Sequence, residues 1–150
     1  IMIGQIYNGM GWYIKGRSNF NFLKATNGRS CDEKGRLNDS NVIPFYSGRK
    51  FSTEWLFDLG MAVDLMQIIK NKKRFKNNSF GIYLGCGYGE REVFWETKAG
   101  NLVTYTPNSY SGLSMDGGLF GSVYSVTISA GVNTIGFKYL EFEAGIGVTF

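Results

Sequence analysis

Large apolar residues alternate with small or polar ones over much of this chain, and this period of two constrains the fold most. The pattern is longest over residues 51–65, where one set of positions is apolar and the other carries three acidic residues. Because successive side chains of a strand point to opposite faces, the pattern predicts a strand with one apolar face. A local helical pattern also exists there, formed by Leu59, Val63, Met66 and Ile69. Gly60 and the β-rich start of the stretch weaken that alternative.

Shorter stretches repeat the alternation along the chain. The predicted strands, joined as a meander, are Ile1–Tyr7, Trp12–Phe22, Phe51–Leu65, Phe80–Arg91, Tyr110–Val123, Val126–Asn133 and Tyr139–Phe150. The composition agrees, since 21 of 150 residues are glycine and only two are proline, and glycine costs about 1 kcal/mol per helix position. The length is that of one domain and no composition change marks a boundary, so residues 1–150 are expected to form a single domain.

Two β-barrel architectures share this pattern and differ in which face points inward. Several glycines lie on the polar face, where they leave room for large side chains inside a narrow barrel but would only weaken a solvent-facing strand. The polar face also carries both charge signs, which can neutralise one another in an enclosed interior. We therefore expect a structural ion network inside the barrel, formed by Lys15, Arg17, Glu54, Asp58, Asp64, Arg91, Asp116, Glu141 and Glu143.

The apolar face lacks charge over the central part of each later strand. A Lys or Arg there would cost about 2–4 kcal/mol at the bilayer midplane, and the strands are long enough to cross a membrane. The sequence thus favours an all-β fold, a small antiparallel up-and-down transmembrane β-barrel of about eight strands with a side-chain-filled interior. Because bacterial barrels use even strand numbers, we expect an eighth strand upstream of Ile1 or outside the stretches identified, closing against residues 138–150.

The last predicted strand has an apolar residue at every second position and stops on an aromatic one. This pattern resembles the C-terminal assembly signal of bacterial outer-membrane barrels, which the barrel-assembly machinery reads, and an ordinary amphipathic edge strand is the alternative. The residues that would form the signal are Leu140, Phe142, Ala144, Ile146, Val148 and Phe150.

Further stretches resemble one family. They are Gly11–Phe20, Leu84–Gly89, Phe94–Glu96, Ser129–Thr134, Phe137–Tyr139 and Gly145–Val148. Together they are similar to the C-terminal barrel domains of Bacteroidetes outer-membrane surface proteins. The resemblance implies an integral protein of a Gram-negative outer membrane, in contact with lipid, and leaves room for further domains before Ile1. It transfers no catalytic motif.

In such barrels the last residue lies on the periplasmic side. The turns at residues 8–11, 70–78 and 123–125 are then periplasmic, while residues 23–48, 98–108 and 135–137 face outward. Five basic residues crowd into positions 70–76. We interpret them as a solvated turn and not a nucleic-acid patch, because no alternating aromatic residues surround them.

Histidine is absent from the sequence, which excludes His-based triads, His metal sites and resemblance to the small outer-membrane barrel enzymes. Cys31 and Cys86 lack metal-ligand spacing and are not expected to pair. A polar loop contains four oxygen-bearing side chains without EF-hand spacing, Asp32, Glu33, Asn38 and Asp39, so we interpret it as solvated. No cofactor or metal is expected.

Three functions remain open on the sequence. The favoured one is a non-enzymatic outer-membrane anchor or scaffold, or an accessory subunit docked against a larger transporter or complex. The alternatives are a soluble β-barrel that binds an apolar ligand, as lipocalins do, and a surface adhesin that acts through residues 23–48 and 98–108.

Overall fold

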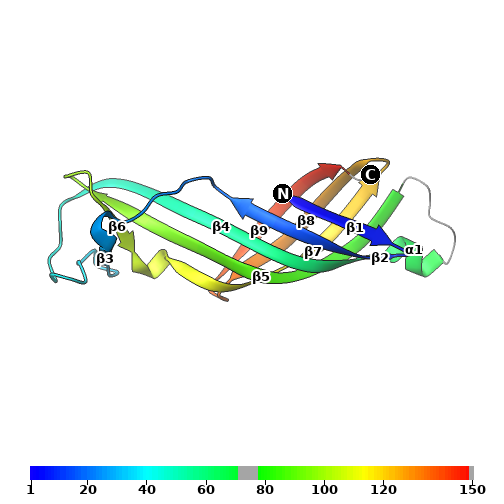
Figure 1. The fold of residues 1–150 in the computed structure, drawn as a ribbon, viewed down its shortest axis with the longest axis horizontal. Coiled ribbons are helices and arrows are strands. Elements are labelled where there is room, and N and C mark those ends of the chain that lie inside the picture. The colour runs from blue at the N-terminus through cyan, green and yellow to red at the C-terminus, as the bar shows by residue number, and fades with distance from the viewer. Residues whose placement is uncertain (71–77, 149–150) are drawn as a thin grey trace. The chain divides into compact units, whose positions relative to one another are not determined.

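The computed structural model describes residues 1–70 and 78–148, which are mostly antiparallel β-sheet. Seven strands follow one another in the order β1-β2-β4-β5-β7-β8-β9 (Figure 1). Their bounds are β1 Met2–Tyr7, β2 Met10–Ser18, β4 Tyr46–Asp64, β5 Asn78–Thr97, β7 Tyr110–Val123, β8 Val126–Ile135 and β9 Tyr139–Val148. Sequential strands are neighbours in the sheet, so the prediction of an all-β antiparallel meander is confirmed.

Two short strands, β3 (Ser30–Cys31) and β6 (Leu102–Tyr105), lie off this path. β6 pairs antiparallel with β5 and parallel with β3. The prediction of a plain loop over residues 98–108 is therefore wrong. Val103 of β6 packs in a small core with Cys31 and Leu37, and this burial stabilises a strand that the short local sequence did not reveal.

The predicted strand Trp12–Phe22 is too long, because β2 ends at Ser18. Phe20 lies beyond it with a φ of 55°, in the left-handed region. The Ser18 hydroxyl accepts a hydrogen bond from the Phe20 amide, and the Asn19 side chain accepts one from the Asn21 amide. These local side-chain bonds take backbone donors that a strand would use in its ladder.

The longest predicted strand also ends earlier than expected. β4 stops at Asp64 and a short helix, α1 (Leu65–Lys70), follows, so the helical alternative was right for Met66 and Ile69. No helix of the described residues is long and apolar enough to cross a membrane. Residues 71–77 of the predicted basic turn at 70–78 lie outside the described residues, as does the terminal Phe150. The eighth strand stays a prediction.

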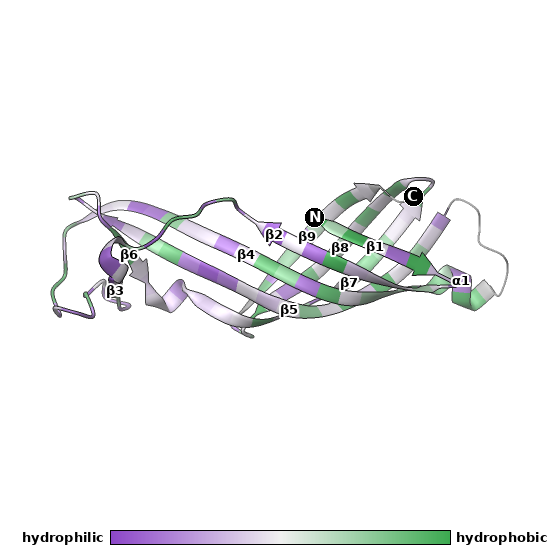
Figure 2. Cartoon of the chain, viewed as in Figure 1, coloured by the Kyte–Doolittle hydropathy of each residue, from purple (hydrophilic) through white to green (hydrophobic). Residues whose placement is uncertain are grey.

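Contacts divide the chain into two compact units. The first unit comprises Ile1–Gly16, Leu56–Tyr88 and Leu113–Phe150, and the second comprises Arg17–Trp55 and Gly89–Gly112. In the first unit, hydrophobic and hydrophilic residues alternate along the strands (Figure 2). Leu84 is 65% exposed, whereas its neighbours Tyr83 and Gly85 on the opposite face are buried, and Ile146 is 85% exposed. Most bulky apolar residues of the first unit thus lie on its outer face, whereas Leu56, Phe120 and Ile135 are buried.

Two tyrosines occupy the inner face of the first unit over glycines of neighbouring strands. A Cβ at Gly60 or Gly85 would collide with the Tyr13 side chain, and one at Gly118 or Gly131 with the Tyr83 hydroxyl. The two rings meet edge to face, with centroids 5.6 Å apart. The inner-face glycines therefore provide the space that buries the tyrosines.

The second unit has a separate aromatic group beside its small core. The Trp95 ring stacks on Tyr105, with centroids 4.2 Å apart, and Tyr46 meets Trp95 edge-on. The Tyr46 hydroxyl donates to the Gly35 carbonyl at 2.7 Å. Both cysteines are free thiols, Cys31 buried and Cys86 exposed.

Candidate functional site

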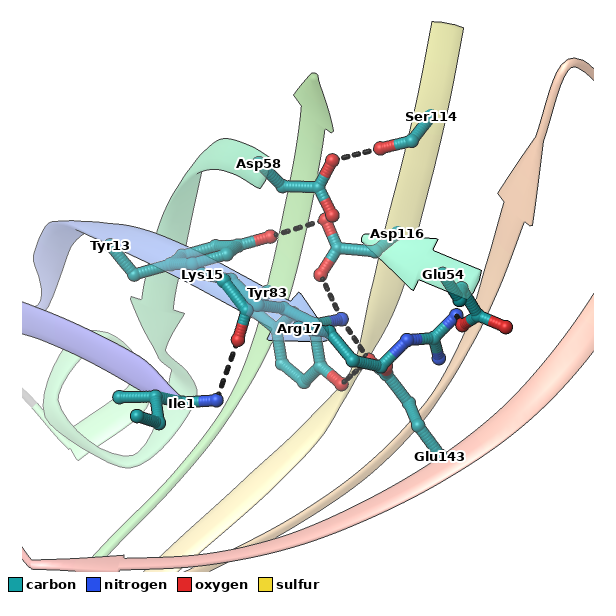
Figure 3. A network of polar contacts seen from close by, with 11 residues as sticks. Ile1, Tyr13, Lys15, Arg17, Glu54, Asp58, Tyr83, Ser114, Asp116 and Glu143 are labelled. Carbon is teal, nitrogen blue, oxygen red and sulfur yellow. Dashed lines mark hydrogen bonds and ion pairs between the residues drawn. The ribbon is translucent and has the colours of Figure 1, made fainter. Parts of the chain in front are cut away.

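A cluster of polar side chains is buried on the inner face of the first unit, and we call it the inner cluster (Figure 3). Five strands contribute to it, namely β2, β4, β5, β7 and β9. Its members occupy the positions that alternate with the exposed apolar residues, and they are Tyr13, Lys15, Asp58, Tyr83, Ser114, Asp116 and Glu143. The period of two thus explains why all of them point to the same face.

Lys15 is the cation of the inner cluster. Its Nζ donates to Oδ2 of Asp116 at 3.0 Å and also to Oε1 of Glu143. The side chains of Lys15, Asp116 and Glu143 are 9%, 0% and 17% exposed. Since Lys15 lies on β2 and Glu143 on β9, this ion pair joins strands near the two ends of the sheet order.

The two tyrosines complete the hydrogen bonding of these carboxylates. The Tyr13 hydroxyl donates to Oδ1 of Asp116 at 2.9 Å, and the Tyr83 hydroxyl donates to Oε1 of Glu143 at 3.2 Å. Asp116 therefore accepts one bond at each oxygen. A buried carboxylate needs such donors, because leaving it unpaired is costly.

Asp58 is the least satisfied member of the inner cluster. It is fully buried and its Oδ1 accepts a hydrogen bond from Ser114, while Oδ2 has no partner among the described residues. Both side-chain polar atoms of Asn133, which lies opposite Asp116 in the β7–β8 register, are likewise without partners there. The inner cluster therefore holds the carboxyl groups of Asp58, Asp116 and Glu143 and the ammonium group of Lys15. Lys15 is its central residue because it supplies the positive charge for these acids.

Three other predicted network residues form ion pairs in the second unit. Arg17 contacts Glu54 at 2.6 Å and Arg91 contacts Glu54 at 3.8 Å, and all three belong to the second unit. Glu141 lies on β9 opposite Asn133.

Asp64 has a different contact from the predicted one. Its Oδ1 accepts hydrogen bonds from the amides of Met66 at 3.0 Å and Gln67 at 3.2 Å. It therefore acts as the N-cap of α1, because the first amides of a helix have no partner within the helix. The strand–helix junction, which the sequence prediction placed differently, explains this role.

The predicted network lacked Tyr13, Tyr83 and Ser114. All three lie at polar-face positions of their strands, so their place in the alternation was the signal that could have found them. A search restricted to charged residues misses neutral donors, although a buried carboxylate needs donors of any kind.

The polar loop of the second unit uses its side chains internally. Oδ1 of Asp32 accepts from the amides of Lys34 and Arg36, Asp39 pairs with Arg29 at 3.0 Å, and Asn38 donates to Ser30. Within residues 1–70 and 78–148 no group of three or more acidic, cysteine or histidine side chains is placed to hold a metal ion.

Comparisons with known proteins give no match: no family model, no curated protein and no solved structure is significantly similar to this chain.

Proposed function

We propose that this chain is an integral outer-membrane β-barrel protein of a Gram-negative bacterium, with the first unit as its lipid-facing part. Its interior is filled by its own side chains, and it acts without enzymatic activity as an anchor or scaffold, or as an accessory subunit of a larger outer-membrane complex. Membrane lipid and the barrel-assembly machinery are its expected contacts.

The observation that carries this proposal is the direction of the two faces of the first unit. Bulky apolar side chains such as Leu84, Phe142 and Ile146 lie outside, while the carboxylates and Lys15 lie inside. A soluble ligand-binding barrel has the opposite arrangement, with apolar residues inside. Contiguous exposed apolar surface of this kind is unfavourable in water and favourable in lipid.

The filled inner face supports a scaffold more than a pore. Tyr13, Tyr83 and Phe120 pack there with Ala62, and the inner cluster ties β2 to β9. A barrel of about eight strands is only wide enough to hold its own side chains. The proposed role therefore needs no solute passage.

Cys86 provides a direct test of the membrane assignment. It lies between Leu84 and Tyr88 on the exposed apolar face of β5. In phospholipid vesicles, a membrane-impermeant sulfonated maleimide should not modify Cys86, because lipid covers the thiol. The same reagent should modify it after the protein is unfolded in urea, where lipid no longer covers the thiol.

The matched control is a Glu33→Cys variant in a Cys86→Ser background, since Glu33 is exposed in the polar loop of the second unit. In vesicles whose protein exposes the polar loop to the bulk solution, the reagent should label the Glu33→Cys variant. Labelling of Cys86 in vesicles at the rate of the control, or a protein that stays soluble without detergent, would contradict the proposal.

A further inference from the structure

The second unit contains a cavity of about 290 Å³ between its polar loop and the turn that precedes β6. Its size lies at the lower end of small-molecule sites. All of its lining residues belong to the second unit, so its existence does not depend on the membrane assignment. Apart from Thr97, its lining comes from residues 23–48 and 98–108, the segments that the sequence analysis named for a surface adhesin.

The cavity lining is basic. Lys98 and Arg29 line it, and its lining residues, as the described part of the chain gives them, include no acidic side chain. Arg29 is paired with Asp39 through its Nε, at 3.0 Å. That contact uses one of the five N–H donors of the guanidinium group. The charge of the lining therefore selects an anionic ligand.

The remaining lining is apolar in the floor and polar at the rim. Leu37 and Val103 are buried and belong to the core of the second unit, whereas Asn27 and Asn101 are exposed at the cavity. The hydrocarbon chain of a fatty acid would cover the two side-chain amides. The amides would then lose their hydrogen bonds to water without gaining others, and this loss is costly. A ligand with many hydroxyl groups can bond to them.

An exposed aromatic ring lies under the Lys98 ammonium group at the cavity. Phe45 lines the cavity and is 82% exposed, and Nζ of Lys98 lies 5.8 Å from the centre of its ring. The ring face that Lys98 does not cover can pack on the C–H face of a sugar while the ammonium group binds a carboxylate. We propose that this cavity binds an acidic sugar, with Lys98 and Arg29 holding its carboxylate.

The experiment measures binding to the full chain in detergent micelles by saturation-transfer NMR and calorimetry. The probes are glucuronate, neutral glucose and inorganic phosphate. Glucuronate should bind saturably at millimolar or lower concentration, and glucose should bind about tenfold more weakly because it lacks the charge-assisted hydrogen bonds. Phosphate should not displace glucuronate.

Two variants locate the binding. Lys98→Gln removes one cation and should weaken glucuronate binding about tenfold, whereas Ala99→Trp fills the exposed mouth without changing charge and should abolish it. Arg49→Gln is the matched control, since Arg49 is an exposed cation of the same unit that does not line the cavity. Its binding should equal that of the wild type. Circular dichroism verifies that each variant is folded.

Three results would overturn the inference. They are no saturable binding of glucuronate, equal displacement by phosphate, which would identify a general anion site, and equal losses in the Lys98→Gln and Arg49→Gln variants. None of them affects the membrane proposal, which rests on labelling of the first unit.

Discussion

Replacing Lys15 by methionine tests the inner cluster most directly. The substitution removes the ammonium group and keeps a side chain of similar length, so Asp116 and Glu143 lose their shared cation. At 3.0 Å from Asp116, the attraction is about 5 kcal/mol for an effective dielectric constant of about 20. The loss of this attraction is partly offset, because the variant no longer has to bury a charged lysine away from water. Breaking a buried ion pair typically costs about 3–5 kcal/mol, and we expect that loss.

The assay is reversible urea unfolding of the protein in lipid vesicles, followed by tryptophan fluorescence. Arg17→Met is the comparison, since Arg17 is 29% exposed and pairs with a partly exposed Glu54, and it should cost about 1 kcal/mol or less. An unchanged unfolding midpoint, or a larger loss for Arg17→Met than for Lys15→Met, would refute the central role of Lys15.

Three further variants or modifications test individual contacts. Gly85→Ala should lower the free energy of unfolding by about 1–3 kcal/mol, because its Cβ would overlap the buried Tyr13 hydroxyl. Burial raises the pKa of the Cys31 thiol, so N-ethylmaleimide should modify Cys86 quickly in detergent and Cys31 only after unfolding, as mass spectrometry would show. Asp64→Ala should cost about 1 kcal/mol in urea unfolding through loss of the α1 N-cap.

Each of these has a matched control. Gly147→Ala should be neutral because nothing lies within 4 Å of its added Cβ, and equal stability of both glycine variants would contradict the packing argument. Cys86→Ser should remove the fast modification, whereas fast labelling that persists would show that Cys31 is accessible. Asp64→Asn keeps a capping oxygen, so a loss as large as that of Asp64→Ala would assign the effect to charge.

The alternation of residue types was sufficient to place most strands. β7 has the predicted bounds, and β1, β8 and β9 begin within one residue of their predicted starts. This works because side-chain direction in a strand depends only on the parity of the position. The ends were harder, since Ser18, Asn19 and Asp64 redirect the backbone through hydrogen bonds that no hydropathy pattern records.

The candidate site was predicted only in part. Parity placed Lys15, Asp58, Asp116 and Glu143 on one polar face, and the structure brings these four together with two tyrosines and a serine. The cavity of the second unit was not predicted, because its walls come from segments that are distant in sequence. A single sequence holds no local signal for such a meeting.

The sequence by itself determined the all-β meander and which side chains share a face, because both follow from a local period of two. Only the tertiary structure decided which charges pair. Lys15 meets partners 101 and 128 residues away, while Arg17, two positions further along, pairs with Glu54. The physical reason is that ion pairing depends on the register of the strands and on how the sheet of the first unit bends. Both are set by non-local hydrogen bonds and by the packing of Tyr13 and Tyr83 over their glycines.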